Sequence, residues 1–156
     1  MRRSLIGVAL LAGLAAACGN HERGFMAAQA DDAAGQLYGK ECGACHMPYP
    51  PSLLPARSWH ALLGRLDSHF GENASLDPQA AGTIAAYLAA NAADTRGSRA
   101  MQGLGPSDVP LRITETPFWI DMHEEVSPTR FASPKVRSKS NCLACHSDKG
   151  EGGDDD

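Results

Sequence analysis

The chain has 156 residues, which suits one domain or two small ones that share an interface. Its 14 basic and 18 acidic residues give a formal net charge of −4, which argues against nucleic-acid binding because phosphates attract positive charge. A transmembrane helix needs about 20 apolar residues. No stretch after the N-terminal apolar segment reaches this length, so we expect no membrane-spanning helix there.

The N-terminus has the pattern of an export signal. Arg2 and Arg3 precede an apolar run over residues 5–17. This run is too short to span a bilayer and fits the hydrophobic region of a secretory signal peptide. We therefore expect a signal peptide over residues 1–17 and a mature protein in the bacterial periplasm.

The cleavage site has three readings. Residues 14–18, Leu-Ala-Ala-Ala-Cys, resemble a lipobox, in which Cys18 is lipidated and attaches the protein to a membrane. This reading explains the fifth cysteine, since an exposed free thiol is unusual in an oxidising compartment. The alternatives are ordinary cleavage near Ala17 and cleavage at the Ala-x-Ala sequence of residues 28–30. Residues 18–30 are expected to form a flexible leader.

Residues 31–95 predict a helical N-terminal lobe. An Ala- and Gly-rich helix over 31–41 is followed by a loop over 47–55, where four prolines forbid a continuous helix. Ser58 is expected to cap a second helix. Its apolar residues follow the i, i+3, i+4, i+7 pattern: Trp59, Leu62, Leu63, Leu66 and Phe70.

A third helix is predicted to begin at Asp77, because a capping Asp is followed by proline at the first helical position. It places Ile84, Tyr87 and Leu88 on one face. Gly, Ser and Asp become frequent from residue 92 onward, and we place a linker at 96–110.

Residues 111–156 predict a shorter C-terminal lobe that ends in an acidic tail. Residues 111–114 are a weak strand candidate. Thr116 followed by proline should start a helix through about Val126, which the Ser127-Pro pair should stop. Basic residues crowd this lobe and serve either solubility or the docking of a partner: Arg130, Lys135, Arg137, Lys139 and Lys149.

Two Cys-x-x-Cys-His motifs lie a hundred residues apart: Cys42, Cys45 and His46, then Cys142, Cys145 and His146. In such a motif both thiols can add to the vinyl groups of one porphyrin, and the adjacent histidine binds the iron. Each motif therefore predicts one covalently attached c-type haem. A thioredoxin-like site would need a βαβ pattern, and a four-cysteine zinc site would need closer pairs. A disulfide within each pair would leave both histidines unexplained.

Four histidines remain as candidates for the opposite, distal side of the two irons. On a helical wheel His69 lies at the margin of the apolar stripe, whereas His60 lies away from it and should be solvated. His123 clusters with the apolar residues of its own helix, and His21 is in the leader. His69 and His123 are thus the candidate distal ligands.

Methionines compete for the same positions. Met101 follows the first motif at a distance that suits a class I cytochrome c ligand, and Met122 could replace its neighbour His123. Met47 adjoins a proximal histidine and cannot easily reach the opposite face. Local reach favours His69 on the first iron and His123 on the second; crossed ligation would require the lobes to interleave.

Four stretches resemble the bacterial dihaem cytochrome c family: residues 42–54, 59–77, 113–117 and 136–146. The phrase over 69–76, His-Phe-Gly-Glu-Asn-Ala-Ser-Leu, together with residues 113–117, is specific to that family. The resemblance implies an all-α fold with a class I cytochrome c-like N-terminal lobe and a short helical C-terminal lobe, each binding one haem. It also implies bis-histidine ligation, which matches His69 and His123.

The expected function is electron transfer by two six-coordinate haems rather than enzymatic catalysis. The resemblance implies periplasmic redox partners, namely a membrane b-type cytochrome and a small monohaem protein that can bind oxygen. The alternatives are a dihaem peroxidase-like enzyme and a haem-based gas-binding protein, and both would need an iron with an open position.

Overall fold

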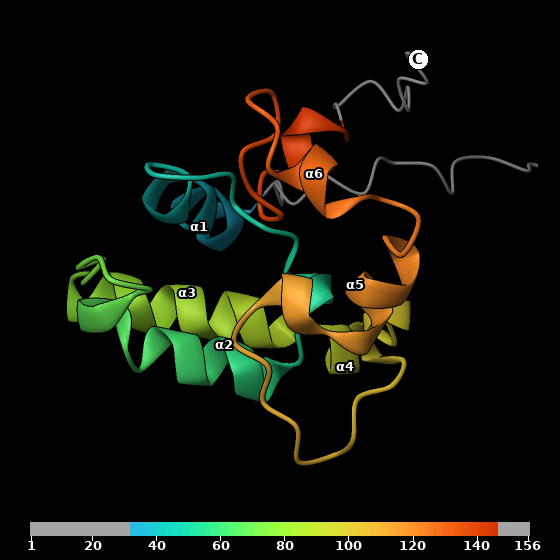
Figure 1. Cartoon of the computed structure of the whole chain (residues 1–156). Helices are drawn as coiled ribbons and strands as arrows, with labels where there is room; N and C mark the ends of the chain where they lie inside the picture. Colours follow the sequence, from blue (N-terminus) through green and yellow to red (C-terminus); the bar gives the residue numbers. More distant parts are fainter. Residues whose placement is uncertain (1–31, 147–156) are drawn as a thin grey trace, which may run out of the picture.

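The computed structural model describes residues 32–146, which are coloured in Figure 1. The expected signal peptide, the lipobox at Cys18, the leader over 18–30 and the acidic tail lie outside these residues. Over 32–146 the fold is all-α, as expected, with one isolated β-bridge and no strand. Within this part of the chain, no helix has the length and apolar character needed to cross a membrane.

Between residues 32 and 146 the structure has six α-helices: α1 (Ala33–Cys42), α2 (Ala56–Leu63), α3 (Pro78–Ala90), α4 (Ala93–Arg96), α5 (Pro117–Met122) and α6 (Pro128–Phe131). Five 3-10 helices lie between or after them: η1 (Pro51–Leu53), η2 (Leu66–Ser68), η3 (Arg99–Met101), η4 (Ile113–Glu115) and η5 (Cys142–Ala144).

The main core lies among the first three α-helices. Figure 1 shows α2 and α3 running side by side, and α3 also packs against α1. The rings of Tyr38 and Tyr87 join α1 to α3, with centroids 5.6 Å apart. The indole of Trp59 donates a hydrogen bond of 2.8 Å to the carbonyl of Pro51, which holds the proline-rich loop on α2. The predicted buried face of α3 is confirmed, since Ile84, Tyr87 and Leu88 are all buried.

The second helix differs from its prediction at both ends. It begins at Ala56 with Pro55 before it, and Ser58 is a buried residue inside the helix rather than its cap. It ends at Leu63, because Gly64 follows and glycine is a poor helix former. His69 therefore lies after η2 and outside any helix, so the helical wheel that selected it does not apply.

The third helix begins as predicted. The Asp77 carboxylate accepts hydrogen bonds from the backbone N–H groups of Gln79 and Ala80, and Pro78 occupies the first position. The segment after it contains two short helices, α4 and η3, in which Ala93 and Ala100 are buried. The Arg57 guanidinium ties the rest of this segment to α2 through a hydrogen bond of 2.9 Å to the Gly105 carbonyl.

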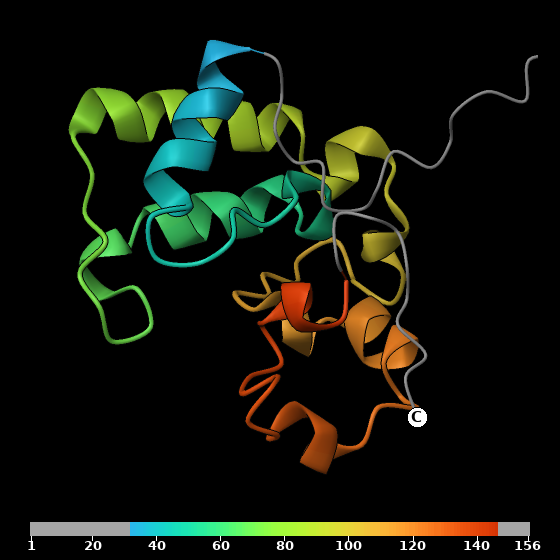
Figure 2. The same cartoon turned by 90° about the horizontal axis from the view of Figure 1, so that it is seen from above.

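The C-terminal lobe lies beside the bundle of α1, α2 and α3 in Figure 2. The strand expected over 111–114 is wrong, because η4 begins there and Thr116 hydrogen-bonds back to Ile113. The same Thr116 caps α5 as predicted. However, α5 ends at Met122 instead of Val126, and Ser127 caps the further helix α6.

Candidate functional site

The first Cys-x-x-Cys-His motif stands at the end of α1. Cys42 is the last helical residue, and the chain then turns through Gly43, whose backbone N–H bonds to the Gly39 carbonyl. A Cβ at position 43 would collide with that carbonyl oxygen, so the tight turn requires glycine. Cys42 is half-buried, and burial raises the pKa of its thiol to about 11. Cys45 is exposed, and neither sulfur forms a disulfide within residues 32–146.

His46 and His69 face each other across the first site. Their ring centroids are 6.2 Å apart, and their planes differ by 21°. Two imidazoles that bind one metal from opposite sides, with bonds of about 2.0–2.1 Å and ring centres about 1.1 Å beyond each nitrogen, lie roughly 6.2–6.4 Å apart. The observed separation therefore fits one iron between these two rings.

Backbone geometry holds His69 in place despite its position outside a helix. Its backbone pairs with Glu72 through hydrogen bonds of 2.8 and 3.1 Å, around a turn with positive φ at Phe70 and Gly71. The His69 Nδ1 is buried and has no hydrogen-bond partner among residues 32–146. Burial, with a smaller contribution from nearby His46, lowers the pKa of His69, which favours the neutral, metal-binding form.

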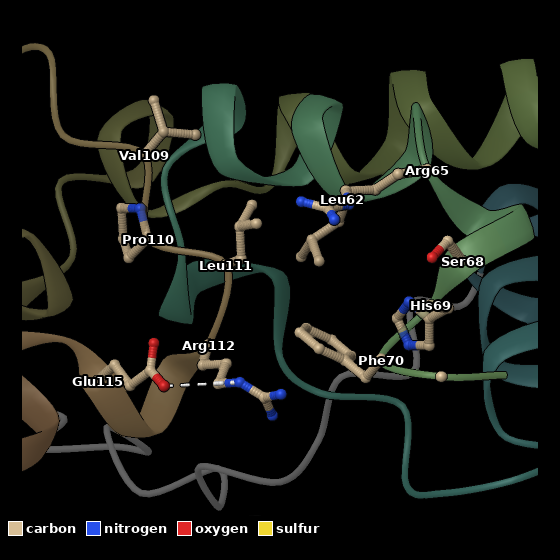
Figure 3. Close-up of a pocket in the computed structure, with 11 residues that line it drawn as sticks. Leu62, Arg65, Ser68, His69, Phe70, Val109, Pro110, Leu111, Arg112 and Glu115 are labelled. Atoms are coloured by element: carbon tan, nitrogen blue, oxygen red, sulfur yellow. Dashed lines mark ion pairs between the residues drawn. The ribbon is translucent and has the colours of Figure 1, made fainter.

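A cavity of about 580 Å³ adjoins His69, and Figure 3 shows its lining. Leu62, Phe70 and Leu111 supply apolar surface from three different segments. Arg112 lies with its guanidinium 4.1 Å from the centre of the Phe70 ring and forms an ion pair of 3.5 Å with Glu115. The cavity thus combines apolar side chains with the charged groups of Arg65, Arg112 and Glu115, and a guanidinium at its wall could pair with a carboxylate of a bound group.

The second motif forms η5, and its histidine faces His123. The His146 backbone N–H bonds to the Cys142 carbonyl over 2.8 Å. The ring centroids of His123 and His146 are 6.0 Å apart, again close to the spacing of two imidazoles on one metal, but the planes differ by 81°. Sequence reasoning left crossed ligation open; the structure brings His46 to His69 and His123 to His146.

Hydrogen bonds set which ring nitrogen is free on two of these histidines. The Nδ1 of His46 lies 2.7 Å from the Met47 carbonyl, and the Nδ1 of His123 lies 2.8 Å from the Trp119 carbonyl. A carbonyl only accepts, so each Nδ1 carries the proton and each Nε2 keeps its lone pair for a metal. The Trp119 ring also stacks on His123, with centroids 4.2 Å apart.

The remaining candidates lie elsewhere. His60 is exposed, as predicted. Met122 is 54% exposed rather than packed beside His123, and Met101 lies in η3. Sequence reasoning missed two contributors: the Trp119 carbonyl, and Tyr49, whose ring stacks on His46 with centroids 5.0 Å apart. The position of Tyr49 three residues after His46 was the one available signal.

The chain is also similar to known proteins. The family model of dihaem cytochrome c matches residues 38–153. A dihaem cytochrome c from Rhodobacter sphaeroides is 54% identical, with a TM-score of 0.67, and the match covers 70% of this chain and 88% of that one. A second structure, of the protein named DHC purified from that organism, is 49% identical, with a TM-score of 0.61 and coverage of 74% and 90%.

A dihaem cytochrome c from Shewanella baltica is 42% identical, with a TM-score of 0.60, and the match covers 76% of this chain and 86% of that one. No curated protein gives a match. The two Cys-x-x-Cys-His motifs, the all-α fold and these likenesses agree with one another. The chain belongs to the dihaem cytochrome c family and binds two c-type haems.

Proposed function

We propose that this protein is a periplasmic electron carrier whose two irons are both six-coordinate, one between His46 and His69 and the other between His123 and His146. Haem-based electron transfer itself follows from membership of the family. The observation that carries the finer proposal is the spacing of the two histidine pairs, 6.2 and 6.0 Å between ring centroids. Each pair leaves room for one metal and for no further ligand between the rings.

Two filled axial positions suit an electron carrier. Haem supplies an iron that accepts and returns one electron, and the protein tunes its potential through axial ligands and their hydrogen bonds. An iron with two histidines has no open position for peroxide or oxygen. Nitrogen ligands without methionine also favour a lower potential than His/Met ligation. A dihaem peroxidase-like enzyme or a gas-binding protein would need one of the four histidines to be displaceable.

The visible spectrum of the purified holoprotein tests this proposal. We expect two low-spin haems in both oxidation states and no change when carbon monoxide is added to the reduced protein, because His69 and His123 fill the distal positions. Recombinant myoglobin, which has an open iron site, serves as the control for carbon monoxide binding. A high-spin component, or a carbon monoxide adduct on either haem, would favour the peroxidase-like or gas-binding alternative.

The proposed partners are redox proteins of the periplasm, namely a membrane b-type cytochrome and a small monohaem protein that can bind oxygen. The charge of residues 127–146 supports docking to an acidic surface. Residues 127–146 contain four basic side chains and no acidic one, and all four are exposed: Arg130, Lys135, Arg137 and Lys139. Exposed charges at the edge of a binding surface chiefly increase the rate at which the partners associate.

Replacement of Cys18 tests where in the cell the protein is located. We propose that this cysteine is lipidated and holds the protein on a membrane that faces the periplasm, because a multiply acylated cysteine anchors firmly whereas one chain does not. After fractionation of the native host, the wild type should be in the membrane fraction and Cys18→Ser should be soluble. Equal solubility of the two would show that the lipobox sequence is a coincidence.

A further inference from the structure

Tyr49 lies between the two haem-binding motifs. Its ring stacks on His46 of the first motif, with centroids 5.0 Å apart and planes 28° apart. Its hydroxyl donates a hydrogen bond of 2.9 Å to the carbonyl of Ser140, which is 91 residues further along the chain. One half-buried side chain therefore contacts segments that belong to two different sites.

The Ser140 carbonyl belongs to the segment that leads into the second motif. The Cys142 sulfur lies 3.6 Å from the same oxygen. Asn141, between them, is held by a bond of 2.9 Å from its side-chain amide to the Val136 carbonyl. The Tyr49 hydroxyl thus holds the backbone two residues before the first attachment cysteine of the second haem.

Tyr49 is itself fixed to the core of the N-terminal lobe. Its backbone carbonyl accepts a hydrogen bond from the hydroxyl of Tyr38 on α1. Tyr38 is buried against α3, with 2% of its surface exposed. These contacts form a continuous path from the packed helices, through Tyr49, to the backbone at Ser140.

We infer that Tyr49 is a positioning residue that sets the distance and orientation of the second haem relative to the first. This inference rests on the proposed function, in which each motif carries one low-spin haem. The step that it serves is the exchange of one electron between the haems, in which one iron is oxidised as the other is reduced. No proton or chemical bond needs to move. A fixed spacing keeps that exchange uniform from molecule to molecule.

The two contacts of Tyr49 can be removed separately. Tyr49→Phe keeps a ring on His46 and loses the hydroxyl, whereas Tyr49→Leu loses both. Without the hydroxyl, the wild-type conformation of the backbone at Ser140 should become up to about tenfold less populated. This loss corresponds to ~1.4 kcal/mol, which is at the upper end of the range for one hydrogen bond. Thr95→Val is the matched control, because it removes a bond of 2.8 Å to the Ala89 carbonyl away from both motifs.

The experiment uses paramagnetic NMR of the complete holoprotein, oxidised and then half-reduced. Tyr49→Phe should shift the methyl resonances of the second haem, spare those of the first, and slow electron exchange between the haems severalfold. Tyr49→Leu should shift both sets, and Thr95→Val should shift neither.

Wild-type exchange and wild-type shifts in Tyr49→Phe would overturn the inference. So would a lower unfolding temperature with unchanged exchange, because the bond would then serve stability alone. Failure of the proposed function would appear differently, as a high-spin haem already present in the wild type.

Discussion

A His69→Ala variant is expected to carry one high-spin haem and one low-spin haem. The His69 ring is the group that faces His46, 6.2 Å away, so its removal should leave the first iron with His46 as its one protein ligand. His123→Ala should have the same effect on the second iron, which would keep His146. The visible spectrum should show about half of the haem converted in each variant, and the converted haem should then bind carbon monoxide.

The two histidine pairs differ in a way that identifies the converted haem. The ring planes are 21° apart in the first pair and 81° apart in the second. Nearly parallel and nearly perpendicular axial rings split the iron d orbitals differently, so the two low-spin haems should give distinct electron paramagnetic resonance signals. His69→Ala should remove the less anisotropic signal, and His123→Ala should remove the more anisotropic one. His60→Ala is the control, because His60 is exposed and faces neither site.

Two other outcomes would contradict this assignment. If both haems stay low-spin in His69→Ala, another side chain serves the first iron, and Met101 is the first to test. If His69→Ala removes the signal of the second haem, ligation is crossed between the lobes. Haem methyl resonances in paramagnetic NMR would check the assignment independently.

Replacing both Cys142 and Cys145 by Ala should leave one haem per chain and unfold the C-terminal lobe. The mass of the denatured protein should exceed that of the polypeptide by one haem, where the wild type gains two. Within residues 111–146 the buried apolar side chains are Trp119 and Val136, too few for a stable core of their own. We therefore expect the second haem to supply much of this lobe's core.

The matched variant replaces Cys42 and Cys45 by Ala. It should also lose one haem, but α1, α2 and α3 keep a packed cluster that includes Leu54, Trp59 and Ile84. Hydrogen exchange should show rapid exchange in α5 and α6 for the Cys142/Cys145 variant, and retained protection in α3 for the Cys42/Cys45 variant. Two haems by mass in either variant would refute covalent attachment at that motif.

Several features of this protein could be predicted from the sequence because they depend on neighbouring residues. A Cys-x-x-Cys-His motif contains its own haem chemistry within five residues. The start of α3 follows from Asp77 and Pro78 alone, and the apolar face of that helix follows from its period. Similar local signals at Thr116 predicted the start of α5.

The ends of helices and the structure of residues 111–114 were harder to predict from the sequence, because competing local interactions decide them. Gly64 ends α2 at Leu63, although the apolar pattern continues to Phe70, and Thr116 turns residues 113–115 into η4. His69 was selected by a helical wheel that the structure does not support. It nevertheless faces His46, because the turn from Phe70 to Glu72 returns the chain to the first site.

The contact of Tyr49 with Ser140 was decided by tertiary structure alone. Local reach along the chain favoured the observed pairing of the four histidines, but tertiary structure was needed to choose it over crossed ligation. These groups are separated by 23 to 91 positions in the chain, and a side-chain pattern has a period of only two to four residues. Which segments meet depends on how α1, α2 and α3 pack and on where the following chain leaves that bundle. The sequence by itself predicted two haems and the motif that would attach each of them, since that chemistry is local. The fold determined which side chains from distant segments meet at each site, since that requires contacts between parts of the chain that are far apart in sequence.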